Sequence, residues 1–513
     1  MIRFRLCNTA FSIGLLLASS AGAQRIAPLP PPCALGGADT ARRIPRPPRQ
    51  PASLAVLPLT VGSGAASFVF LSDGLPDAIA ERIGTSIPRL YVVGRRAQHR
   101  RLGANDGAIR TLGADLGVEY LLAGDMGRSR NNLRLTFTLY DATTGRKTWQ
   151  RAFFYDSAGA LPIEQAVAIE AAARIGGPFS DAEQRGILRV PSARHSAYEA
   201  FLRGNVAADE FARSLAGDAY RRALRIDPSF ADAHARLALT DADVIDENDT
   251  NGPDEGSQLT REMQASADRA VTLDSSLAIA WLAEARAWMI GGRPSAAWTQ
   301  AFQRSLARDS ADPAVLAAYG VALLQDNDRT RARSILERAT KLDPSRADLW
   351  TSLAEIAVAE RRDPDACSLL NRAILEDPLY PPAWAVRALV RGRHDDLRFA
   401  WADAETAERL GSTLLGESAG ALIDLTARDT VRARERLMIL WQDVRDRKSV
   451  SAHEGRAVAV ALLAAGDKSR ALDVLESVRP LGPRYAASLR DSSFDRLRNE
   501  PRFRALVSIR SGS

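Results

Sequence analysis

The pentapeptide GESAG at residues 416–420 has the residue types and spacing of a serine hydrolase nucleophile elbow. In such an elbow the serine sits on a sharp turn between a buried strand and a helix, and acidic and histidine partners follow later in the chain. Asp424 and His453 follow Ser418 in the required order. Whether these residues can act together depends on the elements that carry them.

The residues before Ser418 predict a helix where an elbow needs a strand. The segment AWADAETAERLGSTL, residues 400–414, has a helical composition with a stop at Gly411. The sequence also lacks an HGG-type segment that could form an oxyanion hole. We therefore interpret the pentapeptide as a coincidence. A serine hydrolase using Ser418 ranks third, after the two hypotheses given at the end of this subsection.

The other residues that could do chemistry show no spacing typical of a site. The five histidines are scattered, and the three cysteines, Cys7, Cys33 and Cys367, are too few and too far apart for a disulfide framework or a zinc site. Cys33 lies among prolines and Cys367 in a helical segment, so we expect no bridge between them. We predict no catalytic residue, no cofactor and no metal ion.

A repeat positions most of the second half of the chain. The segment RALRIDPSFADAHARLA recurs in related form, with an aspartate at each joint: Asp227, Asp274, Asp309, Asp343 and Asp377. The last three intervals are 35, 34 and 34 residues, and the first is 47 because of an insertion that we assign to a polar loop at residues 246–256. A helix-turn-helix pattern with this period resembles the tetratricopeptide repeat (TPR).

Tryptophans and alanines recur in phase with these repeats. Trp281, Trp350 and Trp384 occupy the same early position of the first helix of their repeats, and small residues such as Ala332 and Ala366 recur in the second helix. Small residues let paired helices approach closely, and large ones fill the space between repeats. We interpret the set as a packing ladder and not as a cofactor site.

An α/β segment precedes the repeats. Short apolar runs predict buried strands at residues 54–59 and 89–94, and alternating residues across turns at Asn131-Asn132 and Thr144-Gly145 predict an antiparallel meander over 118–155. We expect helices at 72–87, with Ser72 or Asp73 as N-cap, at 106–117, stopped by Gly117, and near 161–175.

The segment VEYLLAGDMGRSRNNLRLTFTLYDATTGRKTW, preceded by LAVLP, FLSDGL and VVGRR, resembles the TolB amino-terminal-like domain. The resemblance covers about 120 residues and implies an α/β scaffold without established catalytic residues. In longer relatives this domain lies between a regulatory output domain and TPR repeats. Here we expect a signal peptide in the place of the output domain, so the resemblance does not by itself imply the signalling roles of those relatives.

The first residues predict export. Arg3 and Arg5 precede an apolar stretch of about eleven residues, and Ala21 and Ala23 form an A-x-A cleavage site. We expect cleavage after Ala23, a periplasmic location and no membrane span in the mature chain. The following residues 24–51, rich in Pro and Arg, predict an extended linker.

The whole chain has 513 residues, 25% of them charged, and a net charge of +6. A charge this small on a chain this long favours a solvated basic surface over a nucleic-acid partner. The expected fold is an α/β N-terminal domain, with a small mixed sheet and flanking helices, followed by an all-α TPR superhelix. The expected parts are a signal peptide (1–23), a linker (24–51), a TolB-like domain (52–180), six or seven repeats (195–480, divergent near 397–450) and a capping tail (481–513).

The sequence favours a non-enzymatic periplasmic scaffold that binds a protein or peptide partner, most simply an envelope protein, in the TPR groove. The alternative is a regulatory accessory protein that acts through a separate output partner. The positions that line the groove in TPR proteins are mostly apolar here, which suits a helical or extended apolar peptide. As an alternative, several of them pack within the superhelix. They are Leu282, Arg286, Met289, Ile290, Ala317, Val321, Leu324, Gln325, Thr351, Glu355, Val358, Ala385, Leu389 and Arg393.

Overall fold

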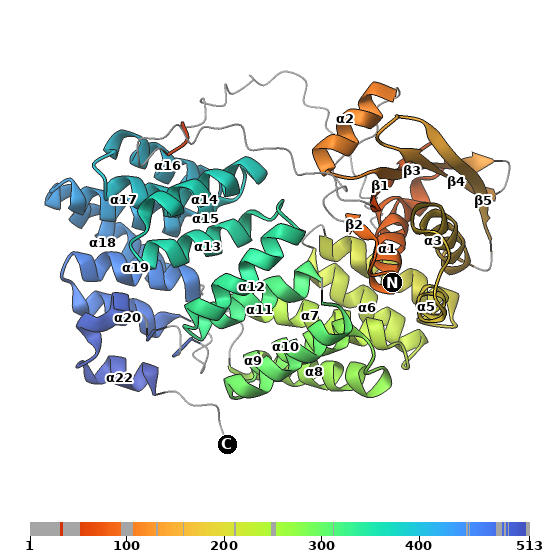
Figure 1. Ribbon diagram of the computed structural model, residues 1–513. Helices are drawn as coiled ribbons and strands as arrows, with labels where there is room; N and C mark the ends of the chain where they lie inside the picture. The colour runs from red at the N-terminus through yellow and green to blue at the C-terminus, as the bar shows by residue number, and fades with distance from the viewer. Residues whose placement is uncertain are drawn as a thin grey trace, which may run out of the picture. The chain divides into compact units, whose positions relative to one another are not determined.

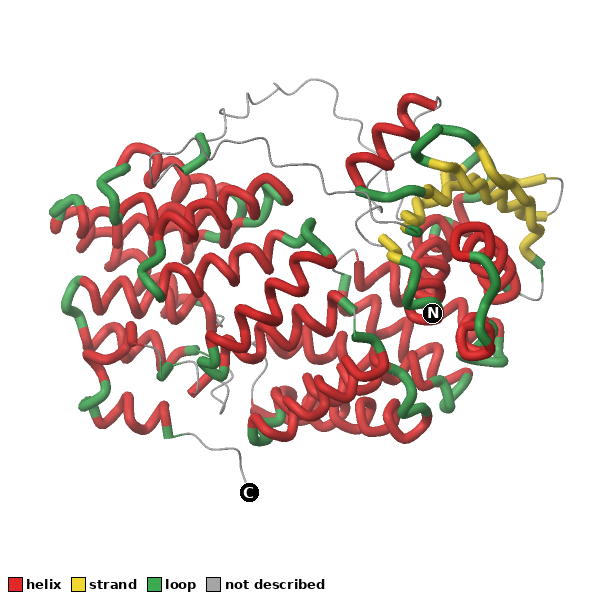
Figure 2. The backbone as a smooth tube through the Cα atoms, viewed as in Figure 1, coloured by secondary structure: helices red, strands yellow, loops and turns green. Residues whose placement is uncertain are grey.

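A five-stranded mixed sheet is followed by a long array of helices in the computed structural model (Figures 1 and 2). The predicted fold class, a small α/β unit followed by TPR-type helices, is thereby confirmed. The structure describes residues 31–33, 52–93, 106–129, 132–156, 159–209, 212–247, 253–310, 312–447, 450, 452–478, 485–486, 489–490 and 492–508. The predicted signal peptide and nearly all of the predicted linker lie outside the described residues.

The sheet has the strand order β2-β1-β3-β4-β5. The strand β1 (Ser53–Val61) runs parallel to both β2 (Tyr91–Val93) and β3 (Tyr120–Ser129). The strands β4 (Asn132–Asp141) and β5 (Lys147–Tyr155) continue from β3 as antiparallel neighbours. The predicted strands and meander are therefore confirmed.

Neighbouring side chains of β1 point into two different cores. Leu54 packs with the helices α1 (Phe70–Ser86) and α3 (Leu161–Gly176), while Ala55 packs with α2 (Asp106–Leu116). This alternation is the two-residue period of a strand that is buried on both faces. It explains why this strand is an almost unbroken apolar run.

The predicted N-cap of α1 is wrong. The helix begins at Phe70 with Val69 in the cap position, directly after a 3-10 turn at Ala66–Phe68. Ser72 therefore lies within the first turn, and its hydroxyl donates to the carbonyl oxygen of Val69 at 2.7 Å. The turn leads the backbone into the helix without a side-chain cap, so the usual preference for Ser or Asp has no role here.

A short helix after the sheet was not expected. The helix α4 (Asp181–Ile187) begins with a capping box, in which the Ser180 side chain accepts from the Glu183 backbone and the Glu183 side chain accepts from the Ser180 backbone. The S-x-x-E pattern at residues 180–183 was the sequence signal for it.

The helical array consists of consecutive helices that pack in pairs, α5 with α6 through to α19 with α20. Within the segment with the weak repeat pattern, residues 397–409, 413–426 and 430–446 are helical. The helices are α5 (His195–Asp209), α6 (Arg213–Ile226), α7 (Ala231–Glu247), α8 (Pro253–Leu273), α9 (Ala278–Ile290), α10 (Ser295–Arg308), α11 (Pro313–Gln325), α12 (Arg329–Leu342), α13 (Ala347–Ala359), α14 (Asp363–Glu376), α15 (Pro381–Gly392), α16 (Leu397–Arg409), α17 (Thr413–Thr426), α18 (Thr430–Asp446), α19 (Ala452–Ala464), α20 (Lys468–Ser477), the 3-10 turn η3 (Ser492–Leu497) and α22 (Pro501–Val507).

The predicted polar loop at 246–256 is wrong at both ends. Helix α7 continues to Glu247, and α8 already begins at Pro253. Proline is well suited to the first helical position, because the backbone N–H that it lacks would have no partner within the helix there. The inserted residues thus lengthen α8.

The ladder tryptophans make a contact that the repeat pattern did not predict. In each case the indole Nε1 donates to the backbone carbonyl oxygen six residues earlier, in the turn before the helix. The pairs are Trp281 with Ser275 (2.9 Å), Trp350 with Pro344 (2.8 Å) and Trp384 with Pro378 (2.9 Å). Each tryptophan thus fixes the entry of the chain into its repeat as well as filling space.

One hydrophobic core extends from the sheet into helices α5, α6 and α7. Within it, the Arg82 guanidinium contacts the Glu164 carboxylate at 2.5 Å and donates to the backbone carbonyl oxygens of Ile187 and Arg189. The Tyr198 hydroxyl donates to the same carboxylate. This buried cluster joins α1, α3, α4 and α5.

Candidate functional site

Ser418 lies in the middle of helix α17 and not on a strand-to-helix turn. Its hydroxyl donates to the carbonyl oxygen of Leu414 at 2.6 Å, and the residue is 2% exposed. Asp424 lies on the same helix, where its carboxylate is 3.4 Å from Arg436 Nε, and His453 lies on α19. The elbow geometry is therefore absent at this serine.

The first glycine of the pentapeptide, Gly416, has a packing role instead. A Cβ atom at Gly416 would lie 2.8 Å from the backbone oxygen of Ala404 and 2.4 Å from Glu408 Cγ, both on α16. Helices α16 and α17 approach too closely at this point for any side chain. The pattern thus reflects helix packing.

Five of the predicted groove residues are buried in the helical array. Leu282 and Met289 belong to the core formed by helices α9 to α13, and the Thr351 hydroxyl donates to the carbonyl oxygen of Ala347 within its own helix. Ala317 and Ala385 are buried as well. Because these residues are buried, they cannot contact a bound peptide directly and can affect the groove only by positioning the residues above them.

The other predicted groove residues are at least partly accessible. Among these, Arg286 pairs with Asp243 of α7, and the exposed Arg393 donates to Asp363 of α14 at 3.3 Å. The half-buried members come from the first helices of four successive repeats, α9, α11, α13 and α15. They are Ile290, Val321, Leu324, Gln325, Glu355, Val358 and Leu389. Their assignment to a peptide-binding groove stays a prediction.

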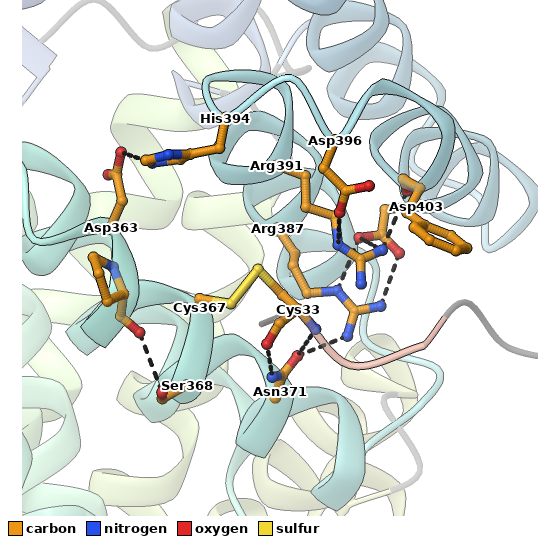
Figure 3. The surroundings of a disulfide bond; sticks show 12 residues. Cys33, Asp363, Cys367, Ser368, Asn371, Arg387, Arg391, His394, Asp396 and Asp403 are labelled. Atoms are coloured by element: carbon orange, nitrogen blue, oxygen red, sulfur yellow. Dashed lines mark hydrogen bonds and ion pairs between the residues drawn. A yellow bond between two sulfur atoms is a disulfide. The ribbon is translucent and has the colours of Figure 1, made fainter. Parts of the chain in front are cut away.

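The expectation that Cys33 and Cys367 are not bridged is wrong. The two form a disulfide across a sequence separation of 334 residues, with 5.6 Å between their Cα atoms (Figure 3). Cys367 lies in α14, and both cysteines are 2% exposed. Scatter along the sequence does not prevent a bridge, because the fold brings residue 33 onto a helix of the fifth repeat pair.

An asparagine beside the disulfide holds the backbone of Cys33. The Asn371 side chain accepts from the Cys33 N–H at 2.9 Å and donates to the Cys33 carbonyl oxygen at 2.8 Å (Figure 3). A carboxamide that satisfies both backbone groups of one residue replaces the neighbouring strand that an extended segment would have in a sheet.

A buried charge cluster lies behind this asparagine. Arg387 donates to Asn371 Oδ1 at 3.0 Å and forms two hydrogen bonds of 2.8 Å with the Asp403 carboxylate. Arg391 contacts the same carboxylate at 2.9 Å. The side chains of these three charged residues are at most 2% exposed, so Asn371 is backed by a fixed network and not by solvent.

Asn371 and its charged neighbours were not singled out from the sequence, because Asn, Arg and Asp are common on helices and their convergence depends on the fold. The cysteine count was the one sequence signal for the disulfide. After cleavage of the predicted signal peptide, an exported chain keeps two cysteines, Cys33 and Cys367, and two cysteines suffice for one bridge.

Among the residues that the structure describes, no cluster of three or more His, Cys, Asp or Glu side chains could hold a metal ion. No helix there combines the length and the apolar character needed to cross a bilayer.

Known proteins resemble this chain in part. A family model for the tetratricopeptide repeat matches residues 323–390, which run from the end of α11 into α15. A curated relative, "Putative adenylate cyclase 3" of Rhizobium meliloti (strain 1021), is 30% identical over 208 residues, which are 38% of this chain and 34% of that protein. The chain thus spans about a third of that relative's length.

Solved structures resemble part of the chain. PilF of Pseudomonas aeruginosa is 18% identical, with a TM-score of 0.35 over 43% of this chain and 94% of its own. YrrB, a TPR protein with an unusual peptide-binding site, is 16% identical, with a TM-score of 0.29 over 40% of this chain and 98% of its own. On the repeat model and the paired helices described above, the chain contains tetratricopeptide repeats.

Proposed function

We propose that this chain is a non-enzymatic, exported scaffold that binds a protein partner through its TPR array. The observation that carries the proposal is the recurrence of half-buried apolar side chains on the first helices of the repeats, among them Ile290, Val321, Leu324 and Leu389. Each is accessible on a helix whose other faces are packed, so together they offer an apolar strip with a rigid support. TPR proteins bind peptides and proteins on such helices.

The Cys33–Cys367 bridge supports the proposed export. Disulfides persist in oxidising compartments such as the periplasm and are rare where thiols are kept reduced. We further propose that the sheet with α1, α2 and α3 is a TolB-like unit that supports the first repeats, since they share one core. The boundaries proposed for these units are residues 52–180 and 195–480.

The test is a cross-linking capture from a native envelope fraction with the full mature chain as bait. A Val321→Glu/Leu324→Glu variant places two carboxylates on the apolar strip. We expect it to recover the wild-type partner at least about tenfold less efficiently, because burial of an unpaired charge in an interface costs more than ~1.4 kcal/mol.

The matched control is Val431→Glu/Ile439→Glu on α18, where both side chains are already more than 60% exposed. It adds the same charges away from the strip and should recover the partner as the wild type does. Equal recovery by both variants, once circular dichroism has shown both to be folded, would remove the apolar strip as the binding element.

A regulatory accessory protein is the second candidate, favoured by the partial identity with a relative named as an adenylate cyclase. On this reading the output activity belongs to a separate chain. The same capture distinguishes the two, because the accessory role requires the recovered partner to be an enzyme or receptor whose activity changes when this chain is added. Ser418, buried within α17, gives no support to the third hypothesis, a serine hydrolase.

A further inference from the structure

We propose that the surface of α14 and α15 around Asn371 is a seat for an extended, cysteine-containing peptide strand of a partner protein, and that Cys33 of this chain occupies it as a placeholder. The seat is distinct from the apolar strip on the first helices. The inference rests on the proposed scaffold function and adds the chemistry of the partner to it.

The seat recognises a peptide backbone, whatever its sequence. Both polar backbone groups of Cys33 are paired with the single carboxamide of Asn371, at 2.9 and 2.8 Å. Any L-residue other than proline presents the same N–H and C=O pair in an extended conformation. A strand from another protein can therefore replace residue 33 without the loss of either hydrogen bond.

The seat is also built before the peptide arrives. Arg387 Nη1 donates to Asn371 Oδ1, and the other two guanidinium nitrogens donate to the Asp403 carboxylate, which Arg391 also contacts (Figure 3). A guanidinium can only donate, so the oxygen of the carboxamide must face Arg387 and its NH₂ group must face the carbonyl oxygen of the peptide. The asparagine is thus oriented by protein groups and loses little freedom on binding.

The side chain at this position is selected by burial and by sulfur chemistry. Cys33 is 2% exposed within an apolar cluster that includes Leu370 and Trp384. A small uncharged side chain fits there, and a large or charged one does not. Among small side chains only cysteine can form the bond that Cys367 offers.

The exchange of occupants is a thiol–disulfide exchange. The thiolate of the incoming peptide attacks Cys367 Sγ, a new sulfur–sulfur bond forms as the bond to Cys33 breaks, and the electron pair leaves with Cys33 Sγ, which takes a proton from water. One disulfide and one thiol are present before and after, so no oxidant or reductant is consumed. Because both cysteines are buried, Cys33 must move away from α14 before the thiolate can reach Cys367 Sγ.

The experiment empties the seat and measures its preference for a peptide. In a Cys33→Asp chain the carboxylate is too costly to bury, so Cys367 is left as a free thiol in an open seat. The probe is a synthetic peptide with the sequence of residues 28–37, PLPPPCALGG, whose cysteine is activated as a thionitrobenzoate disulfide. Release of thionitrobenzoate reports its reaction with Cys367, and dithiobis(nitrobenzoate) serves as a small reagent without a peptide backbone.

We expect the peptide to react about tenfold faster, relative to the small reagent, than it does with a free cysteine, because two backbone hydrogen bonds hold it in place. Asn371→Leu should abolish this advantage and leave the rate with the small reagent unchanged. The control Gln264→Leu removes a carboxamide from α8 and should preserve the advantage. An advantage that survives in Asn371→Leu, or equal slowing of both reagents, would overturn the proposal.

Two further outcomes separate this inference from the function on which it rests. If the peptide shows no advantage while capture still depends on Val321 and Leu324, the seat is wrong and the scaffold stands. If capture is independent of these residues while the peptide advantage persists, the apolar strip is wrong and the seat stands. Dimers of the wild-type chain linked through Cys33 and Cys367 would assign the seat to a second copy and overturn the partner assignment.

Discussion

The fold raises the pKa of the Glu284 carboxyl group, and this shift leads to a testable prediction. Glu284 lies on α9, is 6% exposed, and has one carboxylate oxygen without a hydrogen-bond partner among the described residues. Burial, reinforced by the negative charge of Asp268 on α8, raises its pKa to about 8. A carboxyl group inside the second and third repeat pairs is therefore protonated at neutral pH.

This raised pKa predicts a stability that falls as the pH rises. Between its ordinary pKa of 4.5 and about 8, the folded chain binds more protons at Glu284 than the unfolded chain does. The free energy of unfolding must then decrease with rising pH over this window, and the contribution of the group is present below the window and lost above it. Glu284→Gln should be more stable than the wild type at pH 9 by on the order of 3 kcal/mol, and similar to it near pH 4.

Urea unfolding of both chains across this pH range measures the difference. The control is Glu337→Gln, which removes an exposed acid from α12 and should follow the wild-type curve. A Glu284→Gln chain whose unfolding free energy keeps a constant offset from the wild type at every pH would contradict the assignment.

Patterns of neighbouring residues predicted the elements whose formation depends on local periodicity. The alternation of residues 118–155 predicted the meander, because side chains on a strand must face opposite sides, and the 34-residue period predicted the helix pairs. The Cys33–Cys367 bridge and the Asn371 seat were beyond reach. They join residues more than 330 positions apart, and no local pattern records which helix a distant segment meets.

At the scale of elements, close helix contacts decide which small residues are required. Gly416 faces backbone atoms of α16, which cannot move away, and Gly217 in α6 faces only the far end of the Arg221 side chain, which can. The same chemical change therefore has opposite consequences at the two glycines. The GESAG pattern, read from the sequence as possible chemistry, belongs to this class of constraint.

Gly416→Ala should destabilise the protein by about 1–3 kcal/mol, because the new methyl group overlaps the Ala404 carbonyl oxygen. Gly217→Ala should stabilise it by up to about 1 kcal/mol, because alanine favours a helix and the Arg221 side chain can turn aside. Thermal unfolding of the two variants gives the signs directly. A stabilised Gly416→Ala chain would mean that α16 and α17 are not as close as described.

Boundaries of elements were less predictable than their existence. The start of α1 depends on a preceding 3-10 turn and not on a capping side chain, and the start of α8 on a proline that the sequence also allows in a loop. Local preferences of this kind are worth only about 1 kcal/mol each, which is too little for the sequence alone to choose between neighbouring start positions.

At the scale of the whole molecule, cohesion comes from two kinds of connection. A TPR array is held mainly by contacts between neighbouring repeats, so its stability adds up along the chain. The sheet shares a core with helices α5 to α7, whereas helices α17 to α22 belong to another cluster. The disulfide is the second kind of connection, because it ties residue 33 to the fifth helix pair, which is distant in the sequence.

The loss of this bridge should therefore lower stability through the unfolded state. Closure of a loop spanning 334 residues restricts the unfolded chain by up to about 6 kcal/mol in the chain-entropy model. Cys33→Ser, Cys367→Ser and the double variant should lose similar amounts in urea unfolding, because each removes the same bond and the effects cannot add. The wild type in a thiol reductant should fall to the same midpoint. A wild-type midpoint that is insensitive to reductant, or single losses that sum in the double variant, would mean that the two cysteines stabilise the protein separately and not as a bridge.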